Sequence, residues 1–394
     1  MTPFSRMFFT FIIIIFTFFM IINPQETVKA SADGFKLWYS VLLPALLPFF
    51  IAAELLVSLK FTNFLSLILE PVMRPLFRLP GSSALVIVMG FTSGFPVGAI
   101  LSKKLYDSKM LTEEETERLV SFTNNSSPLF IIGAIGVGML SAPILGYLLA
   151  FSHYAANLLV GLVLKFKAPL PLKTAAPPAL RFNEALKTIS EIPSHGIGRL
   201  VGDAVQNSIN NILTIAGFII IFSVFTRMLI IWGIMDIFAH SIVKILSFTG
   251  LNYHAAYGIG IGIFEITLGT KTVAASNIDI ISQLIIISIL LSFSGLSIIA
   301  QVMSAVAGTK VRLAFYLKAR FMQMLFSALF TYTGYIWLAS HSNPVASFSF
   351  PSYKILYSFD AFRLSINCLI TGSVIIALLM LISLIKEINL KTKT

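Results

Sequence analysis

The sequence predicts an all-α polytopic membrane protein with two pseudo-symmetric repeats that contain re-entrant hairpins and broken helices. Of its 394 residues, 57% are hydrophobic and 11% are charged, whereas soluble domains contain about 25% charged residues. Apolar runs of roughly 17–25 residues, long enough to cross a bilayer, recur along the chain. Polar residues interrupt two of these runs, which is typical of a binding site rather than of a simple anchor.

Membrane spans are expected wherever an apolar run reaches the thickness of a bilayer. These runs lie near 8–22, 37–59, 119–140, 142–164, 207–230, 232–249, 278–306, 312–338 and 362–385. The pieces 61–79, 82–101 and 254–275 are shorter or interrupted by Pro and Gly. We expect 82–101 and 254–275 to be hairpins that do not fully cross the membrane.

The chain divides into five expected parts, with one clear internal boundary at a Pro-rich, cationic stretch. Proline excludes a continuous helix there, and the Lys and Arg residues favour the cytoplasmic side. Residues 1–35 are either a membrane anchor or a signal-like helix, because Val28-Lys29-Ala30 has the small-x-small pattern of a cleavage site. The parts are 1–35, a first repeat at 36–164, a cytoplasmic linker at 165–204, a second repeat at 205–340, and a C-terminal loop and last transmembrane helix at 341–394.

The net charge of +11 does not indicate nucleic-acid binding, because the cationic residues lie in short loops between apolar runs, as the positive-inside rule requires. Cys368 is the single cysteine, and the histidines have no metal-ligand spacing. No phosphate loop, ATPase motif or nucleophile–base pair is recognisable. We therefore expect no enzyme activity, no metal and no cofactor. The lipid bilayer is an expected partner. The sequence does not determine whether the protein forms a homo-oligomer.

The two halves of the membrane part resemble each other. An offset of 171 residues aligns small and polar residues without a gap, placing Gly98 on Gly269, Ser121 on Ser292, Ser126 on Ser297 and Ala134 on Ala305. The alternative is chance, because Ser, Gly and Ala recur in any membrane helix. The repeats are inverted in the membrane if each crosses it an odd number of times.

The interrupted segments supply candidate substrate-binding residues. Thr112 and Glu115 have the spacing of a capping box, so a helix is expected to start there, to run to about Phe122, and to unwind before Pro128. The polar side chains at such a break either bind substrate or only satisfy the freed backbone carbonyls. We expect convergence at mid-membrane of Ser93, Gly94, Asn124, Asn125, Ser126, Ser127, Glu265 and Ser294.

Ionisable residues inside apolar runs are costly and are functional candidates. Glu54 and Glu265 are the clearest, and either could carry the proton of a proton-coupled transporter. The repeat offset of 171 residues places Glu54 within two residues of Arg227 in the second half, which makes a charge pair plausible. A helix break at Gly269 would bring Lys271 close to Glu265. The sequence does not distinguish between H⁺ and Na⁺ as the coupling ion.

Four motifs together carry a family resemblance. They are GFTSGFPVGA at 90–99, ERLVSFTNNSSPLFIIGAIGVGML at 117–140, VGDAVQNSINNILTIAGFIIIFSV at 201–224 and GIGIFEITLGT at 260–270. They resemble the sporulation integral membrane protein YlbJ family of endospore-forming bacteria, over about residues 36–340. That family has the "Gate" or nucleoside-recognition domain, shared with concentrative nucleoside transporters and ferrous-iron transport proteins.

The resemblance implies two repeats, each with a hairpin and a broken helix that meet at mid-membrane. It also implies movement of dipicolinic acid from the mother cell across the outer forespore membrane. The sequence therefore favours a secondary transporter of a small organic anion. A nucleoside-type or other metabolite carrier of the same architecture is the second reading, and a non-transporting sporulation scaffold is the third.

Overall fold

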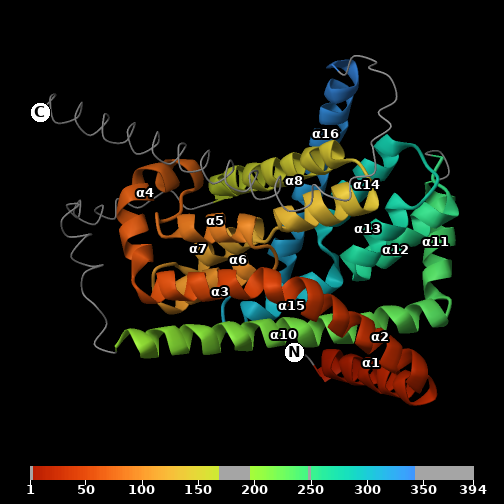
Figure 1. The fold of residues 1–394 in the computed structure, drawn as a ribbon, viewed down its shortest axis with the longest axis horizontal. Coiled ribbons are helices and arrows are strands. Elements are labelled where there is room, and N and C mark those ends of the chain that lie inside the picture. Colours follow the sequence, from red (N-terminus) through yellow and green to blue (C-terminus); the bar gives the residue numbers. More distant parts are fainter. Residues whose placement is uncertain (1–2, 168–195, 247–249, 342–394) are drawn as a thin grey trace, which may run out of the picture.

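The computed structural model describes residues 3–167, 196–246 and 250–341, and every regular element in these ranges is a helix. The predicted C-terminal helix and most of the predicted linker lie outside the described residues. The predicted all-helical class is confirmed. Figure 1 shows the helices as one bundle, with α10 along its lower edge and α8 along its upper edge.

The first part of the chain forms ten helical elements. They are α1 (Pro3–Ile22), α2 (Pro24–Leu37), the π-helix η1 (Trp38–Leu42), α3 (Leu43–Ser58), α4 (Phe61–Phe77), α5 (Ser83–Thr92), α6 (Val97–Asp107), α7 (Glu113–Thr123), the π-helix η2 (Leu129–Met139) and α8 (Pro143–Leu164). A short 3₁₀ turn, η3 (Lys165–Lys167), follows. Helical structure continues from α2 into α3, so the expected boundary at 35–36 falls inside a helical run.

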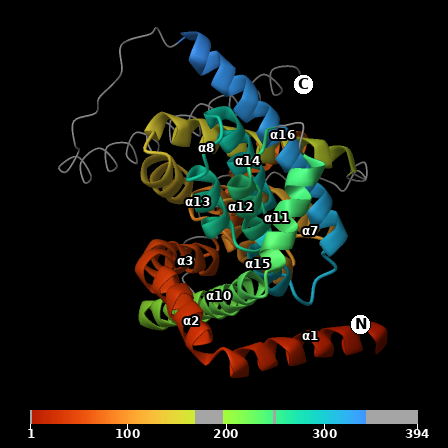
Figure 2. The ribbon, with the colours of Figure 1, turned by 90° about the vertical axis from the view of Figure 1, so that its right-hand side faces the viewer.

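The second part contains seven helices. They are α10 (Ile197–Ile231), α11 (Ile234–Ile245), α12 (Tyr253–Phe264), α13 (Ile266–Ala274), α14 (Ile280–Phe293), α15 (Gly295–Ala305) and α16 (Leu313–His341). Helix α16 packs against α7, α8 and α14, and Figure 2 shows it passing diagonally across the bundle. It therefore joins elements of both halves of the sequence.

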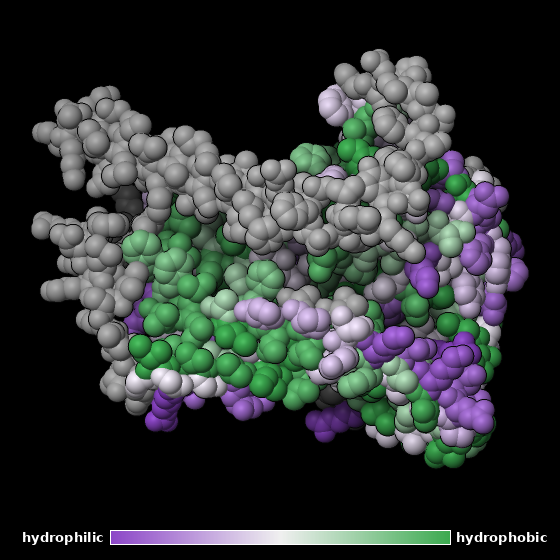
Figure 3. Space-filling model, in the orientation of Figure 1, coloured by the Kyte–Doolittle hydropathy of each residue, from purple (hydrophilic) through white to green (hydrophobic). Residues whose placement is uncertain are grey.

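Among the described residues, four helical segments are long and apolar enough to cross a membrane, or five if the bent α1–α2 pair is one span. The four are Pro143–Leu164, Ile197–Ile231, Ile280–Ala305 and Leu313–Ser340. The expected spans at 37–59, 119–140 and 232–249 are not among them. The first is divided among α2, η1 and α3, the second is divided between α7 and η2, and the third contains only the short α11. Figure 3 shows a broad hydrophobic surface over α3 and its neighbours, as contact with lipid requires.

The two largest groups of buried apolar side chains among the described residues join many of the helices. The larger joins α3, α5, α6 and α7 through residues such as Phe50, Val86 and Phe122. The other joins η2 and α8 to α13 and α14 through residues such as Ile135 and Ile287. Because this second group contains residues from both predicted repeats, the two parts of the chain share one interior.

Glycines allow the α5–α6 segment to approach the end of α7 very closely. A Cβ atom added at Gly90 or Gly98 would lie 2.1 or 2.5 Å from the carbonyl oxygen of Thr123. Real Cβ atoms do not approach a backbone oxygen so closely, so only glycine fits. Packing is also the role of Gly262 and Gly269, where an added Cβ on Gly269 would lie 2.2 Å from the Cα of Gly262. The arrangement of these hairpins into two repeats stays a prediction.

The close approach at Gly98 can be tested by a single methyl group. Gly98→Ala should lower the melting temperature of the purified protein, because α6 must move away from Thr123, at a typical overpacking cost of about 1–3 kcal/mol. Gly202→Ala on α10 is the matched control, since an added Cβ there has no neighbour within 4 Å. Equal melting temperatures for the two variants would contradict the packing.

Candidate functional site

The polar segment after α7 forms a break in the buried interior. Helix α7 starts at the predicted capping box, in which Thr112 and Glu115 bond each other's backbone N–H groups. It ends at Thr123, and Asn124 is extended with φ −89° and ψ 105°. The next helix, η2, starts at Leu129. The predicted start and end of this helix are confirmed to within one residue.

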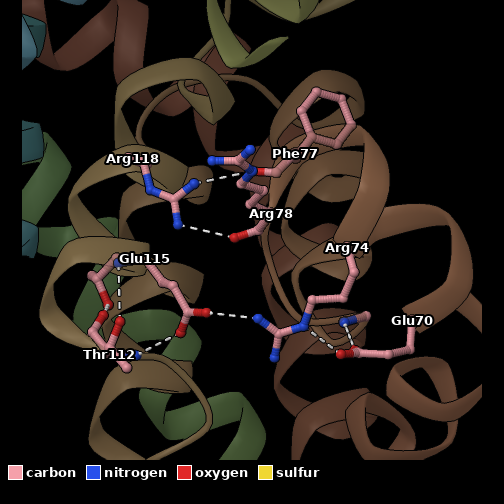
Figure 4. A network of polar contacts seen from close by, with 9 residues as sticks. Glu70, Arg74, Phe77, Arg78, Thr112, Glu115 and Arg118 are labelled. Atoms are coloured by element: carbon pink, nitrogen blue, oxygen red, sulfur yellow. Dashed lines mark hydrogen bonds and ion pairs between the residues drawn. The ribbon is translucent and has the colours of Figure 1, made fainter. Parts of the chain in front are cut away.

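Figure 4 shows how the first turns of α7 are fixed to α4. Arg74 binds Glu115 at 3.1 Å and Glu70 at 2.5 Å. Arg118 donates hydrogen bonds to the carbonyl oxygens of Phe77 and Arg78 at the end of α4. The helix that leads to the break therefore has a rigid beginning.

The amides of the break bind the surrounding helices. Asn124 and Asn125 are both fully buried. The Asn124 side chain accepts a hydrogen bond from the N–H of Ala99 on α6 at 3.0 Å and donates one to the carbonyl of Val120 at 2.8 Å. Asn125 accepts a hydrogen bond from Asn157 on α8. Each amide thus satisfies backbone or side-chain groups that the break leaves free.

Helix α8 supplies the other wall of the break. The N–H of Ser126 donates to the Nε2 atom of His153 at 3.3 Å, and Tyr154 donates to the Ser126 carbonyl at 2.8 Å. His153 is fully buried, and the Oγ atom of Ser126 has no hydrogen-bond partner among the described residues. Ser127 is half-buried, and its hydroxyl accepts a hydrogen bond from the N–H of Phe130 in the first turn of η2.

The largest fully buried side chain of the described chain is Arg320 on α16, which is not among the predicted site residues. Its guanidinium donates to the carbonyl oxygens of Asn124 at 2.9 Å and Ser121 at 2.5 Å, and to the Asn157 side chain at 3.1 Å. It also stacks on Tyr316, 5.1 Å from the ring centre. A positive charge therefore lies directly at the break.

A sequence signal for this residue exists. Five polar residues recur along α16 at helical spacing, and all are fully buried: Tyr316, Arg320, Gln323, Ser327 and Thr331. They follow the i, i+3, i+4 pattern of one helix face. The face contacts α8 through Gln323, whose Nε2 atom lies 3.3 Å from His153, and contacts α14 through Ser327, which bonds Ser288 at 2.6 Å.

A second group of predicted residues lies between α12 and α15. Glu265 separates α12 from α13, and its carboxylate accepts hydrogen bonds from the N–H groups of Thr267 at 3.0 Å and Leu268 at 2.6 Å. Ser294 separates α14 from α15 and is fully buried. A Cβ added at Gly295 would lie 3.3 Å from the Phe264 carbonyl, so the two chain reversals are adjacent.

Tyr316 connects the two groups. Its ring packs in one buried cluster with Ala99 of α6, Val120 of α7 and Ile299 of α15, and its hydroxyl has no hydrogen-bond partner among the described residues. Because Arg320 stacks on the same ring, α16 bridges the break after α7 and the break after α14.

The remaining predicted residues, Ser93 and Gly94, lie at the tip between α5 and α6. Gly94 has φ +95° and would place a Cβ 3.1 Å from Ser127, and the Ser93 hydroxyl is buried without a partner in the described chain.

The predicted charge pairs are wrong. Glu54 pairs with Lys104 on α6 and accepts a hydrogen bond from Asn207, while Arg227 pairs with Glu26 at 2.6 Å. Glu54 and Arg227 occupy nearly equivalent positions in the two predicted repeats. Residues at equivalent positions touch each other only if they lie near the symmetry axis that relates the repeats. Lys271 is exposed and forms no ion pair with Glu265, because α13 continues through Gly269 and the interruption lies at Glu265 itself.

An ion pair also joins the start of α7 to the start of α16. Arg312 binds both carboxylate oxygens of Glu117 through its guanidinium, at 2.9 and 2.7 Å, and donates its backbone N–H at 2.9 Å. Lys310 pairs with Glu113 at 2.8 Å.

Within the described residues, no group of three His, Cys, Asp or Glu side chains is arranged to hold a metal ion.

The buried polar side chains around the break after α7 form what we call the polar centre: Asn124, Asn125, Ser126, His153, Asn157 and Arg320. An open groove of about 630 Å³ lies beside α16, but none of these residues lines it. Its lining is apolar apart from Lys318, and none of the predicted site residues lines it. The polar centre itself is closed, because Asn124, Asn125 and Arg320 are fully buried.

The comparisons with known proteins agree with a polar centre inside a helical membrane bundle. The Gate family, described as nucleoside recognition, matches residues 39–143, which include the α5–α6 segment and the break. The protein is therefore a multi-pass integral membrane protein with a Gate domain. No solved structure matches the chain.

The Bacillus subtilis (strain 168) sporulation integral membrane protein YlbJ is 39% identical over 318 residues, covering 79% of this chain and 78% of that protein. The chain belongs to the YlbJ family of sporulation integral membrane proteins, as its motifs predicted. An uncharacterized protein of Alkalihalophilus pseudofirmus is 30% identical over 129 residues, covering 31% of this chain and 27% of that protein. None of these descriptions names a catalytic activity.

The capping role of Glu265 predicts a graded effect on stability. Glu265→Ala removes both acceptors for Thr267 and Leu268 and should cost about 1 kcal/mol, seen as a lower melting temperature. Glu265→Gln keeps one acceptor oxygen and should retain most of the stability. If both variants melted like the parent protein, the cap would have no role in stability.

The Glu117–Arg312 pair predicts rescue by charge reversal. Glu117→Arg and Arg312→Glu should each lower the melting temperature, because each leaves two like charges together. The double variant should recover roughly 1 kcal/mol relative to the sum of the single effects. Strictly additive losses would show that the pair does not couple α7 to α16.

Proposed function

We propose that the protein is a secondary transporter of a small organic anion, which by family resemblance is dipicolinic acid. It would move this anion from the mother cell across the outer forespore membrane during sporulation. The family assignment supports the sporulation setting, and the Gate match supports an architecture built for binding a small metabolite. The substrate and the membrane are our proposal.

The single observation that carries the proposal is the buried polar centre around Arg320. Charged side chains inside a membrane bundle are costly, and they usually mark the path of a substrate or an ion. The centre combines a guanidinium, carboxamides and hydroxyls with helix ends at two chain reversals. Its formal charge is positive, which suits an anion.

Transport requires an energy source that the chain does not supply from ATP, because no ATPase motif is recognisable in its sequence. We propose coupling to an H⁺ or Na⁺ gradient, or movement along the gradient of the substrate itself. Glu54 is the candidate for the coupling residue, since it is buried against Lys104 and Asn207.

A nucleoside-type or other metabolite carrier is the second candidate function, and the description of the Gate match favours it. A neutral nucleoside would use the carboxamides and hydroxyls of the breaks without needing a guanidinium. A non-transporting sporulation scaffold is the third candidate. It would leave the buried polar centre without a role.

Deletion in a spore-forming host tests the proposed function. Cells without the gene should still synthesise dipicolinate in the mother cell but should form spores that lack it, because the anion does not cross the membrane unaided. Dipicolinate in mother-cell extracts and in purified spores is the measurement, and re-expression of the full chain is the control. Spores with a normal content would refute the transport proposal.

Point variants separate transport from scaffolding. Asn125→Ala and Glu265→Gln should abolish delivery of dipicolinate to spores while the protein still accumulates in the membrane. Loss of a buried polar partner costs about 1–3 kcal/mol, enough to lower affinity roughly tenfold or more. Immunoblots of membrane fractions measure accumulation. Normal spore dipicolinate in both variants would place the substrate site elsewhere.

A further inference from the structure

We infer that Arg320 is the carboxylate-binding residue of the substrate site. This inference rests on the proposed transport function and adds the residue that recognises the carboxylate of the substrate. It concerns a residue of α16, outside the two hairpins and the two breaks.

The first argument is the missing counter-ion. Within the described residues, Arg320 forms no ion pair with a carboxylate. Its three hydrogen bonds end on the neutral oxygens of Ser121, Asn124 and Asn157. By contrast, the buried carboxylates Glu54 and Glu117 each have a cationic partner. The buried guanidinium therefore retains a net charge that an incoming carboxylate would neutralise.

The second argument is unused hydrogen-bonding capacity. A guanidinium has five N–H donors in a planar fork, and three of them are engaged here. The Nε atom of Arg320 has no partner in the described chain. Ser126 Oγ and Gln323 Oε1, on residues that both contact His153, are also buried without partners. Buried polar groups are rarely left unpaired in native proteins, so these groups are suited to a ligand.

The third argument is that the bonds of Arg320 to α7 can be exchanged. Carbonyl oxygens at a helix C-terminus bind a guanidinium more weakly than a carboxylate does, because a carboxylate carries a full charge and accepts two parallel N–H bonds. A carboxylate that binds the fork would replace the carbonyls of Ser121 and Asn124 as acceptors. Substrate binding would thereby release the end of α7 from α16.

The test uses purified full-length protein in lipid nanodiscs and two probes of similar shape. Pyridine-2,6-dicarboxylate carries the charge, and pyridine-2,6-dicarboxamide is its neutral counterpart. We expect the parent protein to prefer the dicarboxylate in calorimetric titrations. Arg320→Gln should lower affinity for the dicarboxylate roughly tenfold or more and leave affinity for the dicarboxamide nearly unchanged, so the preference disappears.

Two further variants separate recognition from folding. Arg320→Lys keeps the charge without the planar fork, so it should retain part of the preference. Arg118→Gln is the matched control, because Arg118 is also buried and also donates to two backbone carbonyls, at the end of α4. It should keep the full preference for the dicarboxylate.

The outcomes distinguish this inference from the proposed function. If Arg320→Gln weakens both probes equally, or leaves their affinity ratio unchanged, Arg320 is only a clamp on α7 and the inference fails while transport stands. If the parent protein binds neither probe, both the inference and the proposed substrate class fail. A preference lost in Arg320→Gln and kept in Arg118→Gln would support the inference.

Discussion

The interior of this bundle depends on the contact between the Arg320 guanidinium and the last carbonyl oxygens of α7. A helix that ends inside a membrane protein leaves its final carbonyls without partners, and water is not available to satisfy them. Arg320 satisfies the carbonyls of Ser121 and Asn124 from another helix. The negative end of the α7 dipole in turn stabilises the buried cation. The break and the arginine therefore each lower the cost of burying the other.

Two different kinds of chemistry stabilise the surroundings of this contact. On the side of α5 and α6, glycine permits direct backbone contact, and Gly98 touches Thr123 at a distance that excludes any side chain. On the side of α8, carboxamide and imidazole groups extend the hydrogen bonding through Asn157 and His153. The break is therefore enclosed by a rigid backbone contact on one side and by an adaptable polar network on the other.

Local patterns predicted the local structure well. The capping box at Thr112 and the end of α7 follow from signals within a few residues, and the structure contains both. The helix break expected at Gly269 lies at Glu265 instead. The predicted break residues Asn124 and Asn125 are buried as expected. Such features depend on backbone geometry and hydrogen bonding between near neighbours, which a single sequence records.

Long-range contacts were harder to predict. The partner of Glu54 is Lys104, not Arg227, because the pairing depends on how α3 lies against α6. Taken alone, Arg320 has no distinctive signal, because one cation in an apolar run resembles a residue that extends toward the membrane surface. Only the whole stripe from Tyr316 to Thr331 distinguishes a buried face from a lipid-facing one. The spatial relation of α16 to both breaks has no local signal.

The Glu117–Arg312 ion pair limits the motions that α16 can make. It lies about two helical turns from the contact of Arg320 with Asn124, on both α7 and α16. Two points of attachment on the same pair of helices prevent α16 from sliding along α7, because sliding would break both at once. Releasing the inner attachment alone would turn the outer ion pair into a pivot, around which the buried end of α7 swings away from α16.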